Sequence, residues 1–447
     1  MSRHTPGPSE DPAVQAAVAG ISRRNMLKGS AGAVALGGVL PTLLAACSRS
    51  SSTNSGSVSG KVSVGSNYSD ASVKKAFAAV VSKYSHGSEI SVNTVDHDTF
   101  QNDISNYLQG TPNDVFTWFS GNRAKYFAKQ GLLEPIDDVW DSIGSHFTDA
   151  VKAASKGADG KYYLVPWINY PWVMFYKTSV FKKYNYTVPE TFDDLLKLCA
   201  QMKKDGFSSP IAIGQKDGWP AMGTFDIINM RLNGYQFHID LMNHKHPWTD
   251  PKVLNVFKTW QRLTPYYTPG GTGRIWEDAV NIFDANKESA MIFQGTDQVG
   301  PQVSKAGLAD LNFFPFPQIV SEYPTDSAID APIDGFLMSA KVKNRKGAAA
   351  FMEYLGTAAA EQTYLESDPS DIGTATDYPT NTYTALQKKS VAIIKSTKNL
   401  AQFLDRDTLP SFAYPDVQNA MNSFLNDPSS YSSICTKLEQ QAKSVFV

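Results

Sequence analysis

Cysteine and histidine are scarce in this 447-residue sequence, which contains 3 of the first and 7 of the second. It contains no Gly-x-Ser-x-Gly, His-Glu-x-x-His or phosphate-loop pattern, so the common signatures of serine hydrolases, zinc proteases and nucleotide-binding enzymes are missing. The formal net charge of −2 gives no reason to expect nucleic acid or a strongly anionic surface as a partner. No repeat period is visible, which argues against a repetitive adhesive or structural protein.

The histidines gather only once, in a polar segment that contains His238, Asp240, His244 and His246. No second pair of residues follows at the spacing of metal ligands, so we expect a solvated turn and no metal site. No cofactor is expected either, because no cofactor-binding motif is present.

Two cysteines, Cys199 and Cys435, lie in the body of the chain, each within an amphipathic helical pattern. They could form a disulfide outside the cell, or they could be free thiols buried in a core. The sequence leaves both alternatives open.

The N-terminal segment has the plan of an export signal. A basic stretch at residues 22–28 precedes an apolar, Gly- and Ala-rich run at residues 31–46, which is shorter than the roughly 20 apolar residues of a membrane-spanning helix. Arg23-Arg24 within Ser-Arg-Arg-x-Met-Leu-Lys resembles the twin-arginine signal, and Leu44-Ala45-Ala46-Cys47 resembles the bacterial lipobox. The resemblance implies cleavage after residue 46, a lipid on Cys47 and anchoring to the outer face of the cytoplasmic membrane.

After Cys47 the chain is almost entirely Ser, Gly, Thr and Asn up to residue 60. This composition cannot bury a core and predicts a flexible linker over residues 47–60.

From residue 61 onward the pattern predicts an α/β fold. Strand-like segments at residues 62–64, 90–95 and 113–118 alternate with helical patterns at 71–84, 98–109 and up to Gln130. Further strands are expected near residues 210–213 and 289–293, and helices dominate from residue 347. Such alternation is typical of a mostly parallel sheet with crossover helices.

Aromatic residues are abundant, with 8 Trp, 20 Tyr and 24 Phe. In an exported protein of near-neutral charge this abundance suggests, weakly, a surface for a flat ligand or a sugar.

Seven short motifs, in this order, are similar to those of the family-1 extracellular solute-binding proteins of bacterial ABC importers, the group of the maltose-binding protein. They occupy residues 112–118, 128–136, 159–166, 175–177, 188–192, 287–292 and 348–355. The resemblance implies two α/β lobes joined by crossing strands, with the ligand in the cleft between them. It further implies a monomeric binding protein, not an enzyme, that delivers a neutral mono- or oligosaccharide to the transmembrane subunits of a permease.

The resemblance also implies a division of the chain. We expect the N-terminal lobe to contain residues 61–167 and 318–360, and the C-terminal lobe to contain residues 168–317 and 361–447.

Loops at the carboxyl ends of strands line the crevice in open α/β sheets, which directs attention to residues just after each strand. In the first lobe these candidates are Asn67, Asp70, Trp118, Asn122 and Arg123. Trp118 offers a flat face for a pyranose, and Arg123 offers a fork of donors for hydroxyl groups. A helix cap for Asp70 and a solvated helix position for Arg123 are the structural alternatives.

The segment at residues 166–172 is the expected first crossing, and it brings Asn169, Tyr170 and Trp172 to the back of the cleft. These side chains could equally be core at the lobe junction. Asp334, near the return crossing, is a natural acceptor for sugar hydroxyls or a hinge hydrogen bond.

In the second lobe Trp219 and Trp276 lie on loops rich in Gly and Pro, where we expect exposed rings that stack on the ligand. Asp297 follows the strand at 289–293, where the maltose-binding relatives carry a tryptophan. An acceptor in place of a stacking ring predicts a ligand that is held differently from maltose.

A secreted carbohydrate-active enzyme is the competing hypothesis. Glycosidic cleavage needs two carboxyl groups about 5 to 10 Å apart, and a sequence cannot exclude that arrangement.

Overall fold

The computed structural model describes residues 58–446. The expected export signal, the lipid site at Cys47 and most of the linker over residues 47–60 lie outside the described residues.

A six-stranded sheet, built from early and late parts of the chain, has the strand order β11-β4-β10-β3-β1-β2. Strand β1 is parallel to β2 and to β3, whereas β10 runs antiparallel between β3 and β4. The strands are β1 (Lys61–Ser66), β2 (Glu89–Thr94), β3 (Val115–Phe119), β4 (Leu164–Asn169), β10 (Ile333–Met338) and β11 (Ile372–Gly373). The three strands predicted from residue 61 onward are confirmed.

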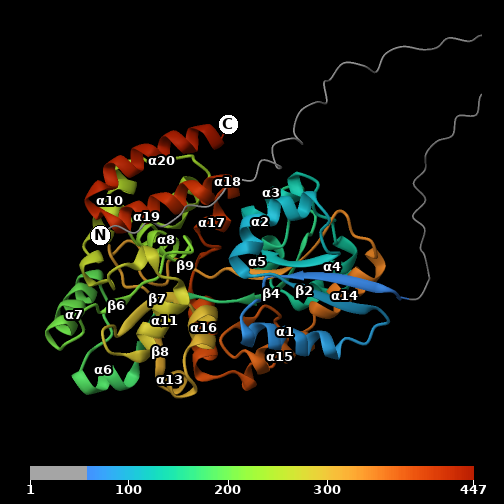
Figure 1. Cartoon of the computed structure of the whole chain (residues 1–447), viewed down its shortest axis with the longest axis horizontal. Coiled ribbons are helices and arrows are strands. Elements are labelled where there is room, and N and C mark those ends of the chain that lie inside the picture. The colour runs from blue at the N-terminus through green and yellow to red at the C-terminus, as the bar shows by residue number, and fades with distance from the viewer. Residues whose placement is uncertain (1–57, 447) are drawn as a thin grey trace, which may run out of the picture. The chain divides into compact units, whose positions relative to one another are not determined.

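Helices pack around this sheet, on the right in Figure 1. Helix α1 packs against α15, and α14 packs against α4, so segments far apart in the sequence share this lobe. The helices are α1 (Ala71–Lys83), α2 (His97–Gln109), α3 (Asn122–Lys129), α4 (Asp137–Ile143), α5 (Asp149–Ala154), α14 (Arg345–Leu355) and α15 (Ala358–Ser367).

A second sheet has four strands in the order β6-β7-β5-β8. Strand β5 is antiparallel to both of its neighbours, and β6 is parallel to β7. The strands are β5 (Trp172–Lys177), β6 (Ile211–Ala212), β7 (Met291–Gly295) and β8 (Leu311–Phe314). The strands expected near residues 210–213 and 289–293 are therefore confirmed.

Helices α10, α19 and α20 pack on one another beside this sheet, at the top left of Figure 1. The preceding helices are α6 (Thr178–Tyr184), α7 (Phe192–Lys204), α8 (Pro220–Asn233), α9 (Tyr235–Met242), α10 (Pro251–Gln261), α11 (Trp276–Ala285), α12 (Thr296–Gln302) and α13 (Lys305–Asp310). The last helices are α16 (Ala385–Ser396), α17 (Leu404–Asp407), α18 (Pro410–Phe412), α19 (Gln418–Asn426) and α20 (Tyr431–Val445).

Three passages of the chain join the two sheets. The first is the step from β4 to β5 through Tyr170 and Pro171, as the sequence predicts. The second runs from β9 (Ile329–Asp330) into β10, and the third contains β12 (Leu400–Ala401), which pairs in parallel with β9. Helix α17 follows β12 and contacts α3 of the first lobe as well as α8 of the second.

These passages correct the expected division of the chain. Strand β11 pairs with β4 and α15 packs on α1, so residues 361–373 belong to the first sheet and not to the second lobe. Gln318 accepts a hydrogen bond from the backbone of Phe192 at the start of α7, so the chain has not yet left the second lobe at residue 318. We propose boundaries at the three passages instead.

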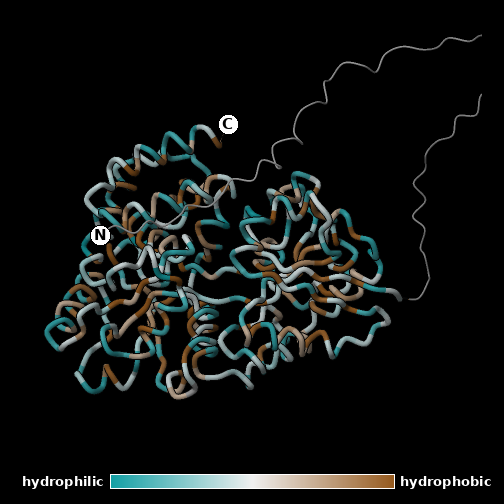
Figure 2. The backbone as a smooth tube through the Cα atoms, in the orientation of Figure 1, coloured by the Kyte–Doolittle hydropathy of each residue, from teal (hydrophilic) through white to brown (hydrophobic). Residues whose placement is uncertain are grey.

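The cores of both lobes are apolar and aromatic, and hydrophobic segments concentrate along the strands in Figure 2. Cys199 and Cys435 are both buried and free, so no disulfide joins them. His238 is also buried, within α9, where its Nδ1 lies 3.2 Å from Asn229 Nδ2, so the expected solvated turn is wrong for this residue. Residues 243–246 do form a turn after α9, and it is partly exposed. Over residues 58–446, no helix is both long and apolar enough to cross a membrane.

Candidate functional site

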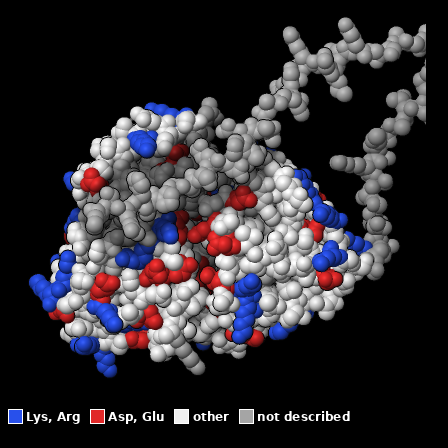
Figure 3. All heavy atoms as spheres, viewed as in Figure 1, with Lys and Arg blue, Asp and Glu red and all other residues white. Residues whose placement is uncertain are grey.

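A polar cavity between the two sheets, here called the acidic cavity, has a volume of about 130 Å³. It lies where the loops after β1 and β2 face the starts of α11 and α12, and Figure 3 shows acidic side chains gathered along the middle of that view. Its lining residues are Asn67, Tyr68, Ser69, Asp70, Val73, Asp96, His97, Asp98, Ile168, Trp219, Trp276, Glu277, Asp297, Gln298, Asp334, Tyr364 and Asp371.

A smaller cavity of about 50 Å³, here called the crossing cavity, shares five of these residues and reaches the passages between the lobes. Its lining residues are His97, Gln101, Tyr170, Trp172, Trp219, Asp297, Gln298, Pro332, Asp334, Phe403, Asp405 and Arg406. The two cavities together are far smaller than the roughly 300–1,000 Å³ of a site for a drug-sized ligand. Their size suits one small ring.

A row of aromatic rings forms one wall. The rings of Phe403 and Trp172 lie 4.6 Å apart, those of Trp172 and Trp219 6.1 Å apart at 86°, and those of Trp219 and Trp276 6.2 Å apart. Trp219 and Trp276 are only 8% and 9% exposed, so the expectation of exposed rings is wrong, yet both rings line the acidic cavity. They are placed to stack on a ligand that enters it.

Arg406 is the cation of the crossing cavity. Its Nη1 donates to Asp334 Oδ1 at 2.6 Å, its Nη2 donates to Tyr170 Oη at 2.8 Å, and its guanidinium lies 4.0 Å from the centre of the Phe119 ring. Burial raises the pKa of the Asp334 carboxyl, and the charge of Arg406 opposes that shift. This cluster ties β10 to the first and third passages.

A second buried pair lies behind it. Arg123 donates from Nη1 to Asp405 Oδ2 at 3.0 Å and to Gln101 Oε1 at 2.8 Å, and its guanidinium lies 4.7 Å from the centre of the Trp118 ring. Tyr414 donates its hydroxyl to the same Asp405 oxygen at 2.9 Å. Arg123 thus binds helix α3 to the third passage, and neither of its expected roles, solvated residue or cleft donor, matches its position.

Carboxyl groups of the two lobes face one another at the acidic cavity. The pKa of Asp98, at the start of α2, is raised to about 7 by burial and by the charges of Asp217, Asp96 and Glu277. The pKa of Glu277, at the start of α11, is also raised to about 7, by burial first and then by Asp217 and other acids. Burial lowers the pKa of His97 to about 4, so this side chain is neutral near pH 7.

Several hydrogen-bonding atoms of this region have no partner in the described structure. The acceptors Asp297 Oδ1, Gln298 Oε1 and Asp371 Oδ1 are all buried and unpaired. A buried polar atom without a partner costs free energy, so these atoms favour a ligand that carries hydroxyl groups. An anionic ligand would meet seven acidic lining residues and no lysine or arginine in the acidic cavity.

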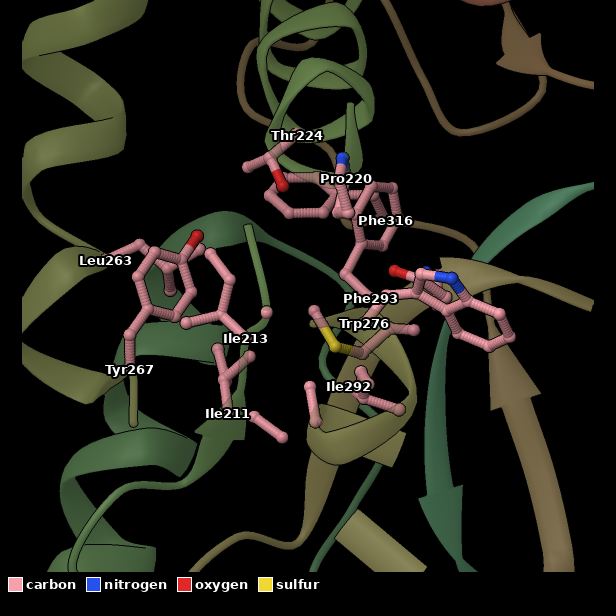
Figure 4. A pocket seen from close by; sticks show the side chains of 15 residues that line it. Ile211, Ile213, Pro220, Thr224, Leu263, Tyr267, Trp276, Ile292, Phe293 and Phe316 are labelled. Atoms are coloured by element: carbon pink, nitrogen blue, oxygen red, sulfur yellow. The ribbon is translucent and has the colours of Figure 1, made fainter. Parts of the chain in front are cut away.

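Behind the aromatic wall lies an apolar cavity of about 20 Å³ in the second lobe, which Figure 4 shows from close by. Ile211, Ile292, Phe293 and other apolar side chains surround it, and Trp276 lines both it and the acidic cavity. Its volume is enough for about one water molecule, so it is no site for a sugar.

The structure brings together eight of the predicted site residues. The acidic and crossing cavities are lined by Asn67, Asp70, Tyr170, Trp172, Trp219, Trp276, Asp297 and Asp334. Asp70 stands at the N-cap position of α1 but makes no capping hydrogen bond with its side chain.

Four predicted residues line neither cavity. Trp118 lies in the core of the first lobe against Phe100 and Phe127, because every residue of β3 is buried and its ring faces the helices. Asn122 Nδ2 donates to the backbone oxygen of Asp407, and Asn169 Nδ2 donates to that of Ala331. These three residues and Arg123 make contacts within the first lobe or with the passages, and their contact with ligand stays a prediction.

Sequence reasoning missed a set of lining residues that come from helix starts and from the C-terminal passage. They are Tyr68, Asp96, His97, Asp98, Gln101, Glu277, Gln298, Tyr364, Asp371, Phe403, Asp405 and Arg406. The charged run at residues 405–407, between apolar segments, was the available signal for the last two.

Two α/β lobes joined by three passages, with a polar cavity between them, define a binding protein of the two-lobed type. The sequence matches the family model of the bacterial extracellular solute-binding proteins over residues 73–401, and the chain belongs to this family. This confirms the predicted family and the predicted fold class.

Solved structures of similar proteins have the same fold. The bacterial solute receptor AcbH is 47% identical, with a TM-score of 0.84 over 87% of this chain and 100% of AcbH, and its structures are described as revealing an exclusive substrate preference for β-D-galactopyranose. A chitin oligosaccharide binding protein, 22% identical, has the same fold, with a TM-score of 0.77 over 87% of this chain and 99% of its own.

Among curated proteins, an uncharacterized ABC transporter extracellular-binding protein of Pyrococcus horikoshii is 25% identical over 72% of this chain and 70% of its own length. The family and these neighbours are transport binding proteins.

Proposed function

We propose that this chain is the sugar receptor of an ABC importer and that it captures a single neutral pyranose. The observation that carries the proposal is the acidic cavity, where the indoles of Trp219 and Trp276 stand beside buried acceptors without donors. A pyranose presents an apolar C–H face to such rings and hydroxyl groups to such acceptors. The likeness to AcbH makes β-D-galactopyranose the first sugar to test.

The small volume supports one ring over a long oligosaccharide. At about 130 Å³ and 50 Å³, the two polar cavities leave no room for an extended chain of sugars in this conformation. The proposed function involves no catalysis, and the carboxyl groups bind the ligand.

Export and anchoring belong to the same proposal. A lipid on Cys47 would keep the receptor near the permease subunits, and the linker over residues 47–60 would let a monomeric body move between capture and delivery. Labelled fatty acid incorporated into the wild-type protein, but not into Cys47→Ala, is the expected result in cells. Equal labelling of both would contradict the anchor.

A calorimetric sugar panel tests the binding function. We expect D-galactose to bind, galacturonate to fail, and saturation at 100 times the dissociation constant to add about 2.7 kcal/mol to the free energy of unfolding. The same incubations with galactosides are assayed for released sugar. Product release would overturn the receptor proposal in favour of a glycosidase, and an absence of binding by every neutral sugar would overturn the ligand class.

A further inference from the structure

Asp371, just before β11, is a buried carboxyl group for which the described structure provides no hydrogen bond and no cation. The residue is 2% exposed and lines the acidic cavity, and its Oδ1 has no hydrogen-bond partner. A buried acceptor without a partner lowers the stability of the fold. A side chain kept in this state favours a role in binding over a role in stability.

The backbone around Asp371 is held firmly. Ile372 pairs with Asn169 at the end of β4, and the side chain of Gln387 donates to the Asp371 carbonyl at 2.8 Å. The next residue but one, Gly373, donates its N–H to the Tyr383 hydroxyl at 2.8 Å. The carboxylate is therefore presented from a fixed strand end, as a specific binding group requires.

The groups that face Asp371 supply no counter-charge. Burial raises the pKa of its carboxyl, and Asp368, Asp297 and Asp334 raise it further. The hydroxyl of Tyr68, which lines the same cavity, is likewise buried without a partner. Arg406, the nearby cation, bonds Asp334 and Tyr170.

We propose that Asp371 accepts a hydrogen bond from one hydroxyl group of the bound sugar and thereby sets which sugar the receptor selects. The inference rests on the proposed function, because it assigns a residue to that same cavity. A site built to hydrogen-bond a hydroxyl discriminates strongly against an analogue that lacks it, since the buried acceptor is then left unpaired. The Tyr68 hydroxyl stands beside this acceptor as a second group for the same ring.

The test compares Asp371→Asn with Asp368→Asn. Asp368 is a matched control, because it lies in the same loop and is also 2% exposed, but it lines neither polar cavity. For the best sugar of the wild-type panel, Asp371→Asn should bind about 5-fold more weakly, the usual worth of one hydrogen bond. Asp368→Asn should bind within 2-fold of wild type.

Two further readouts separate ligand binding from a structural role. Without ligand, Asp371→Asn should melt at the same temperature as wild type or higher, because the described structure gives the Asp371 carboxyl group no hydrogen bond to lose. Against a series of monodeoxy analogues, the gap between wild type and Asp371→Asn should vanish for the analogue that lacks the hydroxyl in question and persist for the others.

A fall in the ligand-free melting temperature, equal affinities of wild type and Asp371→Asn, or one gap across the whole deoxy series would each overturn the inference while the receptor function stands. If the wild-type protein binds no sugar at all, the proposed function and this inference fail together.

Discussion

The acidic cavity and the apolar cavity meet at Trp276, but they differ in open volume and in how many buried polar atoms without a partner line them. In the apolar cavity, aliphatic and aromatic side chains fill the space against one another, and only about 20 Å³ is left. In the acidic cavity, about 130 Å³ remains open, and carboxyl and amide oxygens point into it without donors. The first arrangement stabilises the fold. The second lowers the free energy of unfolding until a ligand donates hydrogen bonds to the free oxygens.

This difference predicts that substitutions on one side of Trp276 change stability and that those on the other side change affinity. The experiments below test that separation.

The largest effect is expected from breaking the Arg406–Asp334 pair, which lines the crossing cavity. Arg406→Ala leaves Asp334 without its cation and Tyr170 without its donor, and breaking such a buried pair costs about 3–5 kcal/mol in the free energy of unfolding. Urea unfolding measures this loss. The control is Arg345→Ala, which breaks a partly exposed pair with Glu134 and Asp138 and should cost no more than about 1 kcal/mol. Equal losses of unfolding free energy in the two variants would contradict the stabilising role of the buried Arg406 cluster.

On the apolar side, Ile292→Ala should destabilise the protein by about 2–5 kcal/mol, because it enlarges a cavity among packed side chains. The dissociation constant for sugar, measured by calorimetry, should stay within 2-fold. Val188→Ala, at a position 43% exposed, serves as the control and should change stability by less than about 0.5 kcal/mol. A large change in affinity for Ile292→Ala would break the separation between the cavities.

At the aromatic wall, Trp219→Ala should weaken sugar binding by about 1 kcal/mol or more, roughly 5-fold, if the ring stacks on the ligand. Trp276→Ala should lower both affinity and stability, because that ring borders both cavities. Trp118→Phe, in the first-lobe core, should leave affinity unchanged. Calorimetric titration would contradict this placement of the ligand if Trp118→Phe were the variant that weakens binding.

The most gradual effect is a dependence of stability on pH. The carboxyls of Asp98 and Glu277 have pKa values of about 7 in the folded chain and ordinary values of 3.8 and 4.5. The folded state therefore holds more protons between about pH 4 and 7, and the stability linked to these protons falls as the pH rises through this range. Glu277→Gln should flatten the slope of melting temperature against pH between 5 and 7.5. An unchanged slope would show that the raised pKa of Glu277 does not cause this pH dependence.

The early part of the fold could be predicted because its patterns are long. Strands β1 and β2 and helices α1 and α2 show clear periodicity, and the loop after β1 placed Asn67 and Asp70 at the cavity. Asp371 and Arg406 could not be found in this way, because β11 has two residues and α17 has four, too few to show any period. Trp118 was misplaced because a strand buried on both faces gives no alternation to show which side faces the ligand.

The three passages that join the lobes also carry Tyr170 and Arg406, with Asp334 just inside β10. In a rotation of one lobe about these passages, points on the axis stay still while points at the rim travel farthest. Arg406 and its partners then act as a pivot common to every degree of opening. The faces that carry Asp98 and Glu277 would move away from each other in the same rotation. Such a rotation would leave this polar centre in place while the two lobes moved about it.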